Sequence, residues 1–398
     1  MSRVLVAGAS VAGPALAHWL RRRGAEVTVV ERAPGLRPGG QAVDARGVTR
    51  EVIRLMGLDD AVRAARTETA GAHTVDADGY VLETFSAEDD GGDGYISEIE
   101  ILRGDLSRVL YDDTRDGVEY RFGDRIAELT QDADGVDVTF ESGDRQRFDL
   151  VIGADGLHSS LRAMVFGPRE RFVRHLGHVL AFYSVPNEFG LDRWLLEYQE
   201  PGRSAMLRPI GDAPRAMAMF SFTAPAFDVD HRDVEAQKSL LRAQVADLGW
   251  LTPRLLAHLD DTPDFYLDQV AQVVMDRWSS GRVGLLGDAA FSSSPLSGQG
   301  TGLALIGAYL LAGDLAAADW NPAAGFARYE ERMRAFVEAN QEIGRLHAKM
   351  RGAADADAEP AGEPDMEWLS GLVERAVNGV ELPDYAGVPD SGPSVTSR

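Results

Sequence analysis

Hydrophobic and polar positions follow two different rhythms along this chain. Near the N-terminus two short apolar runs, Arg3–Ala7 and 26–30, flank a segment with helical periodicity over 14–23. Continuous apolar runs that alternate with helices predict a parallel sheet covered on both faces. Between 171 and 265 the runs are longer and alternate apolar with polar residues, which predicts an antiparallel sheet with one face in solvent. The sequence therefore predicts two layers of different construction.

A glycine-rich turn follows the first apolar run directly. Gly8-Ala-Ser10-Val-Ala12-Gly13 precedes the first helix, and Glu31 ends the next strand. This layout is typical of a dinucleotide-binding unit, in which the turn brings a pyrophosphate to a helix N-terminus and the acid accepts ribose hydroxyls. Ser10 replaces the middle glycine of the G-x-G-x-x-G pattern, so the ligand is expected to approach the backbone slightly less closely.

A second stretch with ligand-binding character runs from Val283 to Leu303. A short apolar strand ends at Gly287-Asp288, a Ser/Pro loop follows, and an apolar helix is expected over 304–318. Unpaired N–H groups at such a helix start suit an electron-rich or anionic group, and an aspartate at a strand end suits a ribose-like hydroxyl. The loop and the helix start supply the remaining candidates, Pro295, Gly298, Gln299 and Gly300.

These motifs resemble those of the single-component FAD-dependent aromatic and polyketide monooxygenases. Para-hydroxybenzoate hydroxylase is the broad type of that family, and the tetracycline-modifying enzymes are a short branch of it. A third motif, from Leu150 to Arg162, resembles the family's strand that ends in Asp155-Gly156, and the match covers residues 1 to about 345. The resemblance implies an α/β fold (α+β overall): a Rossmann-like FAD-binding domain with a parallel sheet, an antiparallel-sheet substrate domain and C-terminal helices.

The resemblance and the change of rhythm together predict the domain boundaries. These are 1–170 and 266–350 for a discontinuous FAD-binding domain, with 71–101 contributing to the substrate region, 171–265 for the substrate domain, 351–383 for a linker and C-terminal helix, and 384–398 for a disordered tail. Residues 118–148 are expected to form a meander of short strands. The segment 266–278 is expected to return to the FAD-binding domain.

The resemblance also assigns roles to residues outside the glycine turns. In the family the aspartate that matches Asp288 holds the flavin's ribityl chain, and the arginine that matches Arg103 reaches ribityl or phosphate oxygens. Asp155 is expected at the cofactor, in a turn that receives Arg162, for which a structural clamp is an equal alternative. The glycine-rich loop after Glu31 is expected to line the flavin, and its candidate contacts, with a solvated surface charge as an equal alternative for each arginine, are Arg32, Arg37, Gly40, Asp44 and Arg46.

Two positions depart from the family's commonest pattern. Phe291 stands where a histidine is common, and Gly302 stands where an asparagine is common. Both positions are expected to flank the flavin site, which leaves flavin binding expected and the fine tuning of its reactivity open.

Composition narrows the partners. The formal net charge of −23 argues against nucleic acid and anionic membranes, which select basic surfaces. The chain has no cysteine, so thiolate chemistry and Cys-ligated zinc are excluded. His175 and His178 are expected on opposite faces of one strand, so we predict no metal site there. No basic and apolar leader precedes the first strand, so we expect a cytoplasmic protein. We also expect the protein to be a monomer.

The resemblance implies a reaction. NADPH or NADH reduces FAD, O2 adds at flavin C4a, and the distal oxygen of the hydroperoxide hydroxylates an aromatic or polycyclic, polyketide- or tetracycline-like small molecule. Because the cofactor supplies this chemistry, no catalytic acid or base is predicted. Two alternatives stay open, a flavin-dependent reductase on the same fold and a non-catalytic flavoprotein that sequesters a drug. A flavin halogenase is disfavoured, because no two of the six tryptophans have the Trp-x-Trp spacing.

Overall fold

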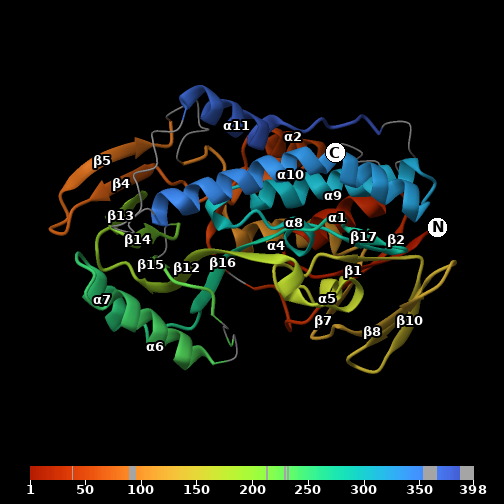
Figure 1. Ribbon diagram of the computed structural model, residues 1–398, viewed down its shortest axis with the longest axis horizontal. Coiled ribbons are helices and arrows are strands. Elements are labelled where there is room, and N and C mark those ends of the chain that lie inside the picture. Colours follow the sequence, from red (N-terminus) through yellow and green to blue (C-terminus); the bar gives the residue numbers. More distant parts are fainter. Residues whose placement is uncertain are drawn as a thin grey trace.

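In a computed structural model, most of the chain forms two large sheets with helices packed on them. The described residues are 1–37, 39–88, 96–211, 214–227, 230, 233–352 and 365–385. Figure 1 shows the large antiparallel sheet at one end of the molecule and the parallel sheet at the other, with the long helix α10 extending over both. The helices are α1 (Ala12–Arg22), α2 (Val48–Met56), α3 (Asp59–Ala64), α4 (Arg103–Thr114), α5 (Ser160–Phe166), α6 (Val234–Val245), α7 (Thr252–Ala257), α8 (Asp288–Phe291), α9 (Gly300–Ala317), α10 (Pro322–Gly352) and α11 (Met366–Asn378).

The first layer is a six-stranded sheet with the order β17-β18-β11-β1-β2-β7, parallel except for β17. Its strands are β1 (Arg3–Ala7), β2 (Glu26–Glu31), β7 (Glu119–Phe122), β11 (Leu150–Gly153), β17 (Ser279–Ser280) and β18 (Val283–Leu285). The central strand β1 is inaccessible to solvent from Val4 to Val6, as its continuous apolar run predicts. The predicted fold class is confirmed.

The second layer is a seven-stranded sheet with the order β16-β12-β15-β14-β13-β4-β5, in which only β13 and β4 run parallel. Its strands are β4 (Gly71–Val75), β5 (Val81–Ser86), β12 (Val173–Pro186), β13 (Trp194–Glu200), β14 (Arg203–Pro209), β15 (Arg215–Thr223) and β16 (Tyr266–Val273). Helices α6 and α7 cover one face (Figure 1), and Leu241 and Leu255 pack into the same core as Phe220.

Two strands do not lie where the pattern placed them. The first strand of the expected meander, β7, pairs with β2 at the edge of the parallel sheet. Strand β16 was expected to return to the FAD-binding domain, but it pairs with β12 in the seven-stranded sheet. Strand patterns record which faces are buried and leave the pairing partner open, and in both cases the partner is distant in sequence.

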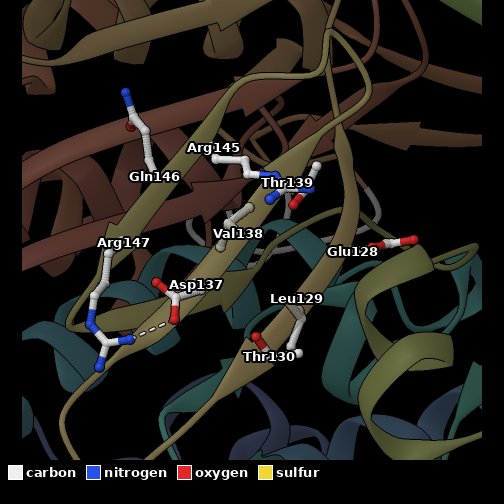
Figure 2. A pocket seen from close by; sticks show the side chains of 9 residues that line it. All are labelled: Glu128, Leu129, Thr130, Asp137, Val138, Thr139, Arg145, Gln146 and Arg147. Atoms are coloured by element: carbon white, nitrogen blue, oxygen red, sulfur yellow. Dashed lines mark hydrogen bonds and ion pairs between the residues drawn. The ribbon is translucent and has the colours of Figure 1, made fainter.

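Two smaller sheets complete the described part of the chain. Strands β8 (Ile126–Gln131), β9 (Val136–Phe140) and β10 (Arg145–Phe148) form an antiparallel sheet, and β3 (Ala42–Asp44) pairs with β6 (Glu100–Leu102). Figure 2 shows a shallow hollow on the three-stranded sheet, where Arg147 is paired with Asp137. This hollow contains none of the predicted site residues.

Helix α9 is the one helix within the described ranges that is long and apolar enough to cross a membrane, but 83% of it is buried inside the protein. It packs between α1 and α10 as a core helix. Its residue Asp314 accepts a hydrogen bond from the hydroxyl of Tyr385 at 2.9 Å. The expected tail from 384 therefore begins too early, because Tyr385 is buried. Residues 386–398, the acidic segment 89–94 and the linker 355–363 lie outside the described residues.

Candidate cofactor site

The first glycine turn is shaped by close backbone packing at the end of β1. Gly8 has a φ of +111°, and a Cβ at this position would overlap the carbonyl oxygen of Ala154, which follows β11. Gly13 lies one turn further on, and a Cβ there would overlap the carbonyl oxygen of Gly8. The chain therefore needs glycine at both ends of the turn to bring the N-terminus of α1 against the strand ends.

Glu31 closes the same turn from the end of β2. Its Oε2 accepts a hydrogen bond from the backbone N–H of Ala9 at 2.9 Å, and its Oε1 accepts one from Ala33 at 2.9 Å. These bonds fix the carboxylate beside the turn, and each oxygen keeps a further lone pair for a ligand hydroxyl. Arg32 and Arg37 are both exposed in the loop that follows.

The Gly287-Asp288 turn meets the first turn directly. Gly287 has a φ of +63°, and a Cβ there would lie 3.3 Å from the Cβ of Ala12 in α1. Asp288 follows at the start of α8 and is accessible to solvent. Even so, burial raises the pKa of its carboxyl, while Ser292, Arg103 and Arg162 act in the opposite direction. Asp288 is therefore accessible although protein surrounds its carboxyl, and we refer to the solvent-accessible space beside Asp288 as the hollow.

Arg103 lies between these turns. Its Nη1 donates to Ser10 Oγ at 2.9 Å, and a Cβ on Gly40 would lie 3.1 Å from its Nε. Burial lowers the pKa of Arg103, as does the charge of Arg37, whereas Asp288 and Glu31 raise it. The arginine thus links the first turn, the glycine-rich loop and the Gly287-Asp288 turn in one place.

The N-terminus of α9 completes this group. Pro295–Ser297 forms a single 3-10 turn, Gly298 takes the left-handed conformation, and Gln299 is buried. A Cβ on Gly300, the first residue of α9, would lie 3.9 Å from Asp288 Oδ1. The unpaired N–H groups of this long helix therefore start beside the Asp288 carboxylate.

Three of the predicted residues, Asp44, Arg46 and Asp155, form hydrogen bonds with neighbouring protein groups. Asp155 accepts four hydrogen bonds from 159–161 and so fixes the N-terminus of α5. Asp44 accepts from Arg46 at 2.9 Å, opposite Glu100 in the β3–β6 pair. For these three residues direct contact with the cofactor stays a prediction.

Arg162 is a clamp. Its guanidinium is 1% exposed and donates to the carbonyls of Ala289 at 2.9 Å and Leu157 at 2.7 Å. It therefore ties the turn after β11 to the Gly287-Asp288 element from behind.

Both departures from the family pattern make close contacts within the protein. The ring of Phe291 is 1% exposed and packs against Trp278, with 4.7 Å between ring centroids, and against Tyr329. A Cβ on Gly302 would lie 2.5 Å from Thr49 Oγ1 in α2. Both residues therefore have packing contacts that account for them, and their expected position beside the flavin stays a prediction.

The reasoning about the two histidines of β12 also needs correction. The register of β12 shifts between His175 and Val179, around Gly177, and both histidines line one surface hollow. His178 Nε2 lies 2.9 Å from the carbonyl oxygen of Ala348, and His175 Nδ1 accepts from the N–H of Gly177. A strand irregularity broke the simple alternation on which that argument depended.

Sequence reasoning missed Tyr266. It lies on β16 and is 42% exposed, and its hydroxyl bonds Asp268, which in turn contacts His158 in the turn after β11. The only signal was an aromatic residue at the start of a strand, and the sequence pattern did not show that this strand pairs with β12.

The described site has the chemistry of a dinucleotide-binding protein with its hollow at the junction of two sheets. The close approach at Gly8, the fixed carboxylate of Glu31, the accessible carboxylate of Asp288 and the cation of Arg103 fit FAD. The glycine turn suits a pyrophosphate, the acids suit sugar and ribityl hydroxyls, and the cation suits phosphate.

The comparisons with known proteins agree. A family model described as an FAD-binding domain matches residues 1–343, and the chain belongs to that family. An uncharacterised protein of Mycobacterium tuberculosis is 44% identical over 386 residues, 97% of this chain and all of the relative. A flavin-dependent monooxygenase of Legionella longbeachae is 38% identical over 383 residues, 96% of this chain and 98% of the relative.

Solved structures give the same assignment. The tetracycline destructases Tet(51) and Tet(55) are 35% and 37% identical, with TM-scores of 0.84 and 0.83, and each match covers 97% of this chain and 99% of the other. The chain is therefore a flavin-dependent monooxygenase, and its cofactor is FAD.

Proposed function

We propose that the protein uses NADPH or NADH and O2 to hydroxylate an aromatic or polycyclic small molecule of the tetracycline or polyketide type. The observation that carries this proposal is the close approach of Gly287 to Ala12, which brings the two predicted ligand motifs together. Helix α8, which follows Gly287, contacts β16 of the seven-stranded sheet. The likeness over nearly full length to two tetracycline destructases supports the substrate class.

When bound, FAD supplies the electron transfer and the activation of O2, and the side chains described above bind and orient it. Glu31 and Asp288 accept hydrogen bonds from its sugar and ribityl hydroxyls. Arg103 and the N-terminus of α9 offset negative charge on the ligand. Because Asp288 and Arg103 lie within surrounding protein, their interactions with the ligand are stronger than they would be in open water.

The seven-stranded sheet supplies the substrate side. Phe182, Met206 and Met219 are partly exposed on the face opposite its hydrophobic core, and a flat fused-ring compound would bind against them. An oxygen-transfer reaction of this class favours a carbon made electron-rich by a neighbouring hydroxyl, which selects phenolic or enolic substrates. No side chain needs to act as a general acid or base for this step.

Turnover under 18O2 tests the proposal. Purified holoprotein is incubated with NADPH or NADH and a panel of tetracyclines and phenolic polyketides, and products are analysed by mass spectrometry. One labelled oxygen atom per product, with substrate-stimulated oxidation of the reductant, is expected. Product without label, or with label from H2 18O alone, would reject oxygen transfer and leave reduction. Ligand binding without any oxidation of NADPH or NADH would indicate a sequestering flavoprotein.

A further inference from the structure

Tyr266 is placed unusually for an aromatic residue of the seven-stranded sheet. It lies opposite Phe182 on β12, and the two rings stack with 4.6 Å between centroids and 24° between planes. The ring is 42% exposed, yet protein surrounds it closely enough that burial raises the pKa of its hydroxyl. Asp268 links this hydroxyl to His158 in the turn after β11, and Arg162 donates both to Leu157 in that turn and to Ala289 beside Asp288. These bonds place Tyr266 close to the Gly287-Asp288 turn of the FAD site, and the effect of Arg103 and Asp288 on the pKa of Tyr266 agrees with that position.

A short hydrogen-bond chain fixes the tyrosine hydroxyl. Tyr266 Oη donates to Asp268 Oδ2 at 3.2 Å, and His158 Nε2 lies 2.6 Å from the same oxygen. Asp268 is 6% exposed, and its Oδ1 accepts from the N–H of Gln269 at 2.7 Å, so the carboxylate has a fixed orientation. His158 belongs to the turn after β11 in the parallel-sheet layer, whereas the other two side chains are on β16. The chain thus crosses the junction between the layers.

The direction of these bonds determines what Tyr266 offers to a ligand. An ionised carboxylate only accepts, so the tyrosine hydrogen is committed to Asp268. The phenolic oxygen then keeps its lone pairs, and it can accept a hydrogen bond from a donor in the hollow. The neighbouring Asp288 is itself an acceptor suited to a hydroxyl, which makes a polyhydroxylated chain the ligand chemistry that satisfies both residues.

We propose that Tyr266 is a further FAD-positioning residue, whose oxygen accepts a hydrogen bond from a hydroxyl of the ribityl chain. Asp268 orients the phenol, and His158 is a positioning residue that acts through Asp268. This proposal needs FAD binding but not the oxygen transfer proposed above, so the two are tested separately.

The test measures FAD affinity of apo-protein by fluorescence titration. Tyr266→Phe keeps the ring on Phe182 and removes the hydroxyl, and it should weaken FAD binding about 3- to 10-fold, as expected for one neutral hydrogen bond. The matched control is Tyr198→Phe. Tyr198 is on the same sheet and also donates to a carboxylate, Glu200 Oε1, at 2.8 Å, but none of the site residues is among its recorded partners. The control should leave FAD affinity unchanged.

A second variant separates positioning from simple structural support. His158→Gln should weaken FAD binding in the wild-type background and have little further effect when combined with Tyr266→Phe, because its action passes through the tyrosine. Urea midpoints of the apo-proteins show whether any loss comes from unfolding. FAD affinity within twofold of wild type in Tyr266→Phe, or equal effects of His158→Gln in both backgrounds, would overturn the proposal. If Tyr266→Phe shows the expected loss of FAD affinity but the wild-type protein gives no labelled product under 18O2, this proposal stands and the proposed reaction is rejected.

Discussion

Replacing Arg208 with methionine should destabilise the protein strongly, although Arg208 is remote from the glycine turns in sequence. Arg208 lies on β14, and its Nη2 donates to Glu100 Oε1 at 2.6 Å, with side chains only 6% and 8% exposed. Thr67 and Thr69 donate to the same carboxylate oxygen, each at 2.6 Å. Methionine keeps much of the apolar stem but leaves a buried carboxylate without its cation. Breaking a buried ion pair from one side costs about 3–5 kcal/mol of unfolding free energy.

The size of this loss should depend on pH in a defined direction. Burial alone would raise the pKa of Glu100, but Arg208 and the hydroxyls of Thr67 and Thr69 together lower it below its usual value. A carboxyl with a lowered pKa stabilises the fold above its unfolded-state pKa, and that stability is lost as the pH falls through the folded-state value. Without Arg208 the burial effect dominates and the pKa rises. The difference between the proteins should therefore be largest near pH 7 to 8 and shrink towards pH 4.

Urea unfolding of apo-protein, followed by circular dichroism at several pH values, measures this difference. The control is Arg147→Met, which breaks an exposed pair with Asp137 (Figure 2) and another with Asp132, just after β8. Adding Glu100→Gln to Arg208→Met should recover much of the loss, because the unpaired charge is gone. A loss no larger than that of the control, or no recovery in the double variant, would show that Glu100 is stabilised in some other way.

Three further substitutions test the site. Asp288→Ala should weaken FAD binding roughly tenfold or more, because a hydrogen bond to a charged group contributes about 1.5–3 kcal/mol. An unchanged FAD dissociation constant in a fluorescence titration would contradict this role of Asp288. Arg103→Ala should weaken FAD binding with little change in the apo-protein melt, and the reverse result would mark it as structural. Phe291→His should lower stability, because it places a polar ring among Trp278 and Tyr329, and a stable variant with an altered flavin spectrum would return the residue to the cofactor site.

The parts of the site that could be predicted are those encoded locally. Gly8 and Gly287 occupy positive-φ turns after strands, Glu31 is the last residue of β2, and Asp288 lies three residues after the end of β18. A short stretch of sequence is enough to recognise each of these features. The structure brings all four together with Arg103, as the motifs led us to expect, although direct contacts with FAD stay predictions.

The parts that could not be predicted depend on long-range pairing. Tyr266 lies close to the Gly287-Asp288 turn only because β16 pairs with β12, and an alternating pattern does not specify that partner. The partners of Glu100 are likewise spread from Thr67 to Arg208 along the chain. The direction of the Phe291 ring likewise depends on distant residues, Trp278 and Tyr329 of α10, whereas the motif fixes only its place in the sequence.

The position of the hollow gives FAD a structural role as well as a chemical one. Asp288 follows β18 of the parallel sheet, whereas Tyr266 lies on β16 of the seven-stranded sheet. A ligand with partners on both sheets binds only the arrangement in which both are in place, so it stabilises that arrangement by RT ln(1 + [L]/Kd), about 2.7 kcal/mol at a hundredfold excess over Kd. On the proposal for Tyr266, FAD therefore holds the substrate sheet at a fixed distance from its own reactive ring. A substrate that binds on that sheet is then held in a fixed position relative to the cofactor, and oxygen transfer to one particular carbon requires such an orientation.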